Sequence, residues 1–125
     1  MEIILKREAL SNTLQNINSV VDKSTTKPIL SNFVISTIDG NDRDVEFSST
    51  DYELSLVEFV TAKIKEQGSI CVNAKKVFDI VRELQADDVH IRSTEQLWIH
   101  ITCGTSETRL PSVEVGLYPQ TVLEE

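Results

Sequence analysis

The chain has 125 residues, 40% of them hydrophobic, which suffices for one domain with a single core. Its formal net charge of -8 argues against a general binder of nucleic acid or membrane surfaces, although it leaves room for a local basic patch. No stretch approaches the roughly 20 apolar residues that cross a bilayer, and residues 1–7 lack the features of a signal peptide, so we expect no membrane partner and a cytosolic location.

The first half of the chain is expected to fold as a strand, a helix and three strands. The strand covers Glu2–Lys6 and leads directly into a helix over residues 7–21, in which apolar residues recur every three or four positions. Pro28 follows a polar loop and forces the residue before it into an extended conformation that stops a helix. The three strands are expected over residues 33–38, 45–49 and 54–64, with turn chemistry around Gly40 between the first two.

The outer face of the helix over residues 7–21 is polar and almost uncharged. Its members are Glu8, Ser11, Asn12, Gln15, Asn16, Asn18 and Ser19. Such a face is typical of simple exposure to solvent, and it also suits a helix that lies near a polyanion without being repelled by it. The residues leave both interpretations open.

The second half repeats the order of the first, with a period of roughly 65 residues. It is expected to form a strand over residues 69–72, a helix over residues 73–84, and strands over residues 89–93, 97–103 and 105–110. Helices that do not alternate one-for-one with strands favour an α+β fold with antiparallel sheets and both helices on one face. We therefore predict two pseudo-symmetric strand-helix-three-strand halves.

The helix over residues 73–84 has two distinct faces. Asn73 suits its N-cap position, because the side-chain oxygen can accept a hydrogen bond from a free amide of the first turn. One stripe is apolar and consists of Ala74, Val77, Phe78, Val81 and Leu84. The opposite stripe carries three cations and two anions, which are Lys75, Lys76, Asp79, Arg82 and Glu83. Ile80 belongs to neither stripe and lies at the flank beside Leu84.

The hairpin that follows this helix allows a test of register, because cross-strand neighbours share a face of the sheet. If the loop holds an odd number of residues, the inward set is Val89, Ile91, Leu97, Ile99 and Ile101. The outward set is then His90, Arg92, Trp98 and His100. Trp98 beside Arg92 suits a cation–π pair, and an exposed Trp98 would equally suit a contact surface.

No residue set predicts catalysis or metal binding. Cys71 and Cys103 are expected inside and both histidines outside, which excludes a Cys–His nucleophile. His100 and Cys103 point to opposite faces of one strand, so they cannot be joint zinc ligands. The chain also lacks the motifs of hydrolases, phosphate-binding loops and metalloproteases. We therefore expect a non-enzymatic binding role with no metal and no cofactor.

Three stretches, Lys-Pro-Ile-Leu-Ser-Asn at 27–32, Ser-Thr-Asp-Tyr-Glu-Leu at 49–54 and the helix at 73–84, resemble the N-terminal domain of the bacterial DNA polymerase III beta subunit family, the replicative sliding clamps. The resemblance covers nearly the whole chain and includes the closing Tyr118-Pro119. It implies the processivity fold, with sheets outside and helices lining the hole of a ring that encircles duplex DNA. It also implies a non-catalytic replication factor in the bacterial cytoplasm, with sequence-independent contact to double-stranded DNA.

The resemblance further implies roles for particular residues. The DNA-facing set would be Lys75, Arg82, Lys23, Ser24 and Gln15, where Ser24 stands at a position that often holds arginine in relatives. The interface with a second clamp chain would be formed by Ile80, Leu84, Thr105 and Glu107. Some relatives place arginines at the last two positions, so ion pairing there would be absent or reversed in sign.

The resemblance also implies that this chain is one domain of a longer protein. Residues 1–120 would form the clamp domain and residues 121–125 would begin a linker to a second domain. DNA polymerase and the clamp loader would then bind through domains outside this chain. The alternative is an acidic α+β protein-interaction module unrelated to DNA, in which Trp98 and Ile80 form a binding patch.

Overall fold

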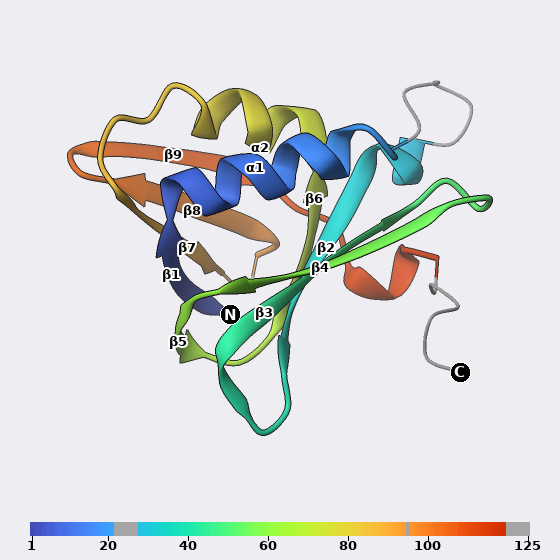
Figure 1. Cartoon of the computed structure of the whole chain (residues 1–125), viewed down its shortest axis with the longest axis horizontal. Helices are drawn as coiled ribbons and strands as arrows, with labels where there is room; N and C mark the ends of the chain where they lie inside the picture. Colours follow the sequence, from blue (N-terminus) through green and yellow to red (C-terminus); the bar gives the residue numbers. More distant parts are fainter. Residues whose placement is uncertain (22–27, 95, 120–125) are drawn as a thin grey trace.

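The structure is a computed structural model that describes residues 1–21, 28–94 and 96–119, and it places two helices on one side of two antiparallel sheets (Figure 1). The helices are α1 (Arg7–Asn18) and α2 (Ala74–Val81), with short 3-10 turns η1 (Pro28–Ser31) and η2 (Val115–Leu117). The strands are β1 (Glu2–Lys6), β2 (Asn32–Ile38), β3 (Asn41–Thr50), β4 (Ser55–Thr61), β5 (Lys63–Glu66), β6 (Ser69–Asn73), β7 (Asp88–Ser93), β8 (Trp98–Cys103) and β9 (Ser106–Pro111). The predicted α+β class is confirmed.

The two halves of the chain exchange their first strands. One sheet has the order β5-β1-β7-β8-β9, so β1 of the first half lies among strands of the second half. The other sheet has the order β4-β3-β2-β6, so β6 of the second half completes the sheet of the first. The pairings β1 with β7 and β2 with β6 are both antiparallel and occupy equivalent places in the two halves. The predicted internal repeat is therefore present, and the exchange locks its two copies together.

The main core lies between the sheets and the helices. Alternate strand residues point toward the helices, which follows from the two-residue period of a strand. The largest fully buried side chains include Ile3, Leu10, Leu14, Phe33, Phe47 and Ile91. The rings of Phe33 and Phe47 stack on adjacent strands with centroids 5.8 Å apart.

A second, smaller cluster fixes the segment after β9 to the outer side of the β2 and β6 strands. It consists of Val34, Cys71 and Tyr118, with Val113 and Val115 packed against it. The amide of Val113 donates to the carbonyl of Cys71 at 2.9 Å, and the amide of Thr50 donates to the Tyr118 hydroxyl at 2.9 Å. Burial raises the pKa of Tyr118 to about 12.

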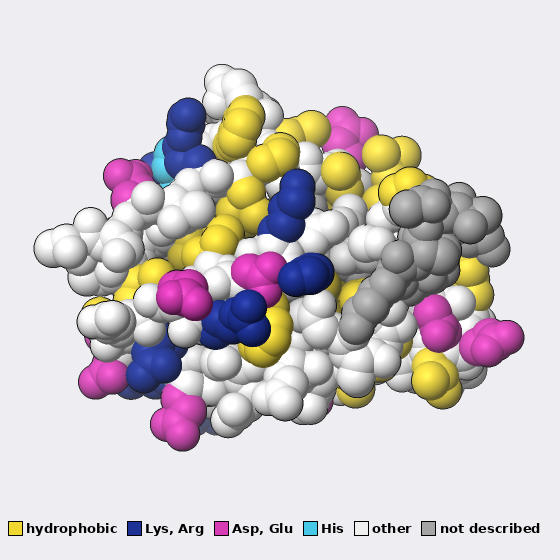
Figure 2. Space-filling view, turned by 90° about the horizontal axis from the view of Figure 1, so that it is seen from above, with side chains coloured by type: hydrophobic (Ala, Val, Ile, Leu, Met, Phe, Trp, Pro, Cys, Tyr) yellow, Lys and Arg dark blue, Asp and Glu magenta, His cyan; other side chains and the backbone are white. Residues whose placement is uncertain are grey.

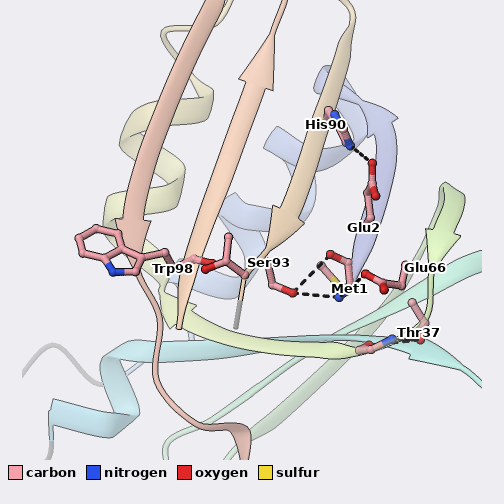
Figure 3. Close-up of polar contacts among 9 residues, drawn as sticks. Met1, Glu2, Thr37, Glu66, His90, Ser93 and Trp98 are labelled. Atoms are coloured by element: carbon pink, nitrogen blue, oxygen red, sulfur yellow. Dashed lines mark hydrogen bonds and ion pairs between the residues drawn. The ribbon is translucent and has the colours of Figure 1, made fainter. Parts of the chain in front are cut away.

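Met1 is buried at the end of the sheet where β1 begins between β5 and β7 (Figure 3). Its amino group donates to the Ser93 hydroxyl at 2.9 Å and lies 3.4 Å from a carboxylate oxygen of Glu66. The backbone of Gly68 lies against Met1, so close that a Cβ atom at Gly68 would sit 3.0 Å from the Cβ of Met1.

The expected strand over residues 54–64 was wrong as a single element. It is divided into β4 and β5, which belong to different sheets. The break falls at Ala62, whose side chain is buried and whose amide donates to the carbonyl of Arg43 at 2.7 Å. Both helices are also shorter than expected, and each ends in a turn.

The register of the β7–β8 hairpin was right for four of its five inward residues. Val89, Ile91, Ile99 and Ile101 are buried, and Ile91 faces Ile101. Leu97 was wrong, because it occupies the turn with a φ of 61° and is 43% exposed. The predicted partner of Trp98 was also wrong, since the guanidinium over its ring belongs to Arg109 at 5.3 Å.

Candidate nucleic-acid interface

The helix layer presents one broad face to solvent (Figures 1 and 2). Each helix begins where a strand of the sheet ends, α1 directly after β1 and α2 directly after β6. Asn73 caps α2 as predicted, because its side-chain oxygen accepts a hydrogen bond from the amide of Lys76 at 2.9 Å. The apolar stripe of α2 packs on the core, with Ala74, Val77 and Val81 buried. The charged stripe is therefore held toward solvent.

Asp79 partly neutralises the cations of α2. Its carboxylate lies 2.9 Å from the Lys75 ammonium and 3.5 Å from the Arg82 guanidinium. The hydrogen bond from Lys75 lowers the pKa of Asp79. Lys75 and Arg82 nevertheless remain 73% and 57% exposed. The stripe is thus mildly positive, and Figure 2 shows acidic side chains among the Lys and Arg side chains in the middle of this face.

The exposed face of α1 is built mostly from neutral polar groups, with Glu8 in its first turn. Gln15 is exposed on it, and the side-chain amide of Asn16 donates to a carboxylate oxygen of Glu58 at 2.8 Å. The side chain of Asn18 joins the two helices. Its amide nitrogen Nδ2 donates to the backbone carbonyl of Leu14 in α1 and to that of Ala74 in α2. The helices are therefore fixed relative to each other at this end.

A cleft opens between the end of α1 and the start of α2, with a volume of about 400 Å³. It is lined by Asn18, Val21, Ser31, Asn73, Lys75, Lys76 and Asp79. Lys75 and Lys76 both belong to the first turn of α2, where the helix dipole also favours negative charge. The chemistry of this end of the helix face suits a phosphate group better than a cation.

Three of the five residues expected to face DNA lie among the described residues and are exposed. Lys75, Arg82 and Gln15 are exposed on the helix layer, whereas Lys23 and Ser24 lie outside the described residues. Asp79 was not part of the expected set. It lies four residues after Lys75 and three before Arg82, and residues at these spacings are neighbours on a helix, so the sequence could have revealed both ion pairs.

The four residues expected at a chain–chain interface differ in their exposure to solvent. Ile80 is half-buried against the core, while Leu84 is only 9% exposed and belongs to the core. Thr105 is exposed in the turn before β9, and Glu107 is exposed in β9, an edge strand of its sheet. The thiol of Cys103 donates to the carbonyl of Ala86 at 3.4 Å, which holds the β8–β9 turn beside the segment after α2.

The histidines and cysteines do not converge. His90 pairs with Glu2 at 2.7 Å, His100 lies 3.7 Å from Glu107, and both cysteines are buried. Burial raises the pKa of Cys71 to about 11. Within residues 1–21, 28–94 and 96–119, no group of three or more His, Cys, Asp or Glu side chains is arranged to hold a metal ion. None of the helices described is long and apolar enough to cross a membrane.

Two strand-exchanged halves with a weakly charged two-helix face define a domain of the clamp type. The model of the family "DNA polymerase III beta subunit, N-terminal domain" matches residues 1–122. The chain belongs to this family.

Curated relatives and solved structures agree with this assignment. The beta sliding clamp of Chlamydia pneumoniae is 34% identical over 119 residues, which cover 95% of this chain and 32% of that protein. The beta sliding clamp of Caulobacter vibrioides is 33% identical over 121 residues, with the same coverage of each chain. The crystal structure of the Caulobacter crescentus clamp superposes with a TM-score of 0.89 at 31% identity, over 99% of this chain and 33% of that one. The chain spans about a third of the length of the curated relatives it matches.

Proposed function

We propose that this chain is the N-terminal domain of a DNA replication processivity factor, part of a ring that encircles duplex DNA and tethers the replicative polymerase in the bacterial cytoplasm. The observation that carries the proposal is a nearly neutral, slightly basic helix face on a protein of net charge -8. Such a face attracts phosphates weakly and without reading bases. The proposed role is non-catalytic.

The proposed contact with DNA is made by the helix layer. Lys75 and Arg82 would approach phosphates, Gln15 would contribute a neutral hydrogen-bonding group, and Lys23 and Ser24 would act from the loop after α1. A strongly basic lining would hold the duplex in place, whereas an acidic one would repel it. Pairing of both cations with Asp79 keeps their attraction moderate, which suits a surface along which DNA slides.

The proposed contact with a second clamp chain is made at Ile80, Leu84, Thr105 and Glu107. Because Leu84 is largely buried, Ile80 would supply more of the apolar surface. Glu107 is 64% exposed and would require a cation or a neutral partner opposite it. Polymerase and clamp loader would bind through parts of the protein outside this chain. A full-length protein that stayed monomeric at micromolar concentration in sedimentation would contradict this part of the proposal.

The DNA contact is tested by fluorescence anisotropy with a labelled duplex at several salt concentrations. We expect weak binding that falls with salt, and a Lys75→Ala variant whose log–log salt slope is smaller by about 1. Lys65→Ala is the matched control, because Lys65 is exposed on β5, away from the helix layer. Salt-independent binding, or equal slopes for the two variants, would favour an acidic protein-interaction module unrelated to DNA.

A further inference from the structure

The outer face of the five-stranded sheet carries a row of three basic side chains. The strand register places Arg92 of β7 opposite His100 of β8, and His100 opposite Arg109 of β9. The inward neighbours on these strands, Ile91 and Ile99, are fully buried, so the row lies on the face turned away from the core. Both arginines are exposed. We call these three residues the outer basic row.

The carboxylates nearest this row lie against histidines and not against its two arginines. Glu2, which faces Arg92 across β1 and β7, instead pairs with His90 at 2.7 Å (Figure 3). Glu107 lies 3.7 Å from His100. Within the part of the chain that the structure describes, neither Arg92 nor Arg109 forms an ion pair. Among the described residues these two arginines thus have no paired anion, on a protein that has 20 acidic and 12 basic residues.

Arg109 is held in place by an aromatic ring. Its guanidinium lies over the ring of Trp98 with the carbon atom 5.3 Å from the ring centroid. Stacking leaves the N–H groups at the edge of the guanidinium plane free to donate, and it reduces the side-chain entropy lost when they do. Trp98 itself is 38% exposed. This arrangement suits bidentate recognition of a planar anion such as a carboxylate.

We propose that the outer basic row binds an acidic protein segment through two carboxylates, one on Arg92 and one on Arg109. The two arginines lie two strand spacings apart, about 10 Å, so the segment must present its carboxylates at that separation. Glu2 and Glu107 occupy strand positions next to the row. They would repel the continuous negative charge of a nucleic-acid backbone, whereas a segment with separated carboxylates avoids them.

This surface is independent of the proposed DNA contact. The row lies on the opposite side of the sheet from α1 and α2, so a partner bound there would leave the helix layer free. The segment is therefore expected to bind whether or not the helix face holds DNA.

Trp98 provides the readout, because it is the only tryptophan in the chain. The 125-residue chain is titrated with a synthetic eight-residue peptide of alternating glutamate and glycine, and with the same peptide carrying glutamine in place of glutamate. We expect a saturable change in Trp98 emission with the glutamate peptide that weakens as salt is added. Arg92→Gln should weaken binding about fivefold or more, as expected for the loss of one charged hydrogen-bonding pair.

The matched control is Arg43→Gln, which removes an exposed arginine from β3 in the other sheet. The affinity of this variant for the glutamate peptide should be within about twofold of that of the parent, because Arg43 is not expected to pair with the peptide. Arg109→Gln changes the surroundings of Trp98, so its binding is followed by calorimetry. Equal binding of the two peptides, or an unchanged affinity in Arg92→Gln with an unchanged unfolding midpoint, would overturn the proposal. So would a duplex DNA that competes with the peptide and loses affinity in Arg92→Gln, because the row would then be a nucleic-acid contact.

Discussion

The ammonium group of Lys75 lies 2.9 Å from the carboxylate of Asp79, one helical turn further along α2. The same carboxylate is 3.5 Å from Arg82, so one acid sits between the two cations expected to face DNA. Exposed pairs of this kind contribute little to folding stability. Their larger effect is on the electrostatic field of the helix face, which Asp79 makes less positive.

Removal of that acid should strengthen DNA binding. We expect Asp79→Asn to bind duplex DNA about threefold to tenfold more tightly at low salt, with a steeper salt dependence, because Lys75 and Arg82 are released for phosphates. The measurement is the same anisotropy titration over a range of salt. Glu83→Gln is the control, since it removes an equal charge from the turn that follows α2, at a residue with no ion pair among the described residues. Equal effects of the two variants would show that only net charge matters.

A side chain at Gly68 should destabilise the domain. An added Cβ would lie 3.0 Å from the Cβ of Met1 and 3.1 Å from its Cα, and Met1 is itself fixed by Ser93 and Glu66. We expect Gly68→Ala to lower the free energy of unfolding by about 1–3 kcal/mol in urea denaturation, the usual cost of overpacking. Gly116→Ala, where nothing lies within 4 Å, should change it by less than about 0.5 kcal/mol. Similar free energies of unfolding for the two variants would mean that Met1 shifts at little cost to make room for the added methyl group.

Loss of the Tyr118 hydroxyl should also be costly. Tyr118→Phe removes the acceptor of the Thr50 amide, which lies in a buried part of β3, and leaves that amide without a partner. The expected decrease in the free energy of unfolding is about 1–3 kcal/mol. Tyr118→Leu should cost more, because the ring also packs on Val34 and Cys71. If Tyr118→Phe were as stable as the parent, water would be satisfying the Thr50 amide.

Alkaline pH should destabilise the domain through the same cluster. Burial raises the pKa of Tyr118 from 10.0 to about 12, and that of Cys71 from 9.0 to about 11. Between these values the unfolded chain loses the protons before the folded chain does, so the folded state holds more protons and stability falls as pH rises. Urea midpoints should decline from pH 9 to pH 12. The decline should be shallower in Tyr118→Phe, and a parent midpoint that did not change over this range would contradict the prediction.

Much of the fold could be predicted because the periodicity of apolar residues is strong. Apart from the division of residues 54–64, the order of helices and strands, the repeat and the bounds of β1 all follow from the sequence. The division of residues 54–64 could not be predicted, since alternation continues through Ala62 while the chain crosses from one sheet to the other. Leu97 was misplaced because hydrophobicity alone does not reveal a turn residue with positive φ. The exchange of β1 and β6 depends on tertiary contacts that no local pattern encodes.

The candidate site was predictable in part because the spacing of residues along a helix determines which of them share a face. Helical spacing correctly placed Lys75 and Arg82 on the solvent side of α2. It also correctly placed Leu84 in the apolar stripe, since Leu84 is 9% exposed and belongs to the core. Of the outer basic row, the hairpin register correctly placed Arg92 and His100 on one face, whereas Arg109 joins them only through the register of β9 with β8.

The strand exchange also bears on how this chain folds during synthesis. Ile3 of β1 can pair with Ile64 of β5 on one edge, but its partner on the other edge, Ile91, is available only after β7 has left the ribosome. One edge of β1 therefore stays unpaired while most of the domain is made. Pairings between such distant residues require a large loop to close, which slows folding and exposes unfinished sheet edges. The nascent chain is therefore most vulnerable to aggregation in the interval between the emergence of β1 and that of β7.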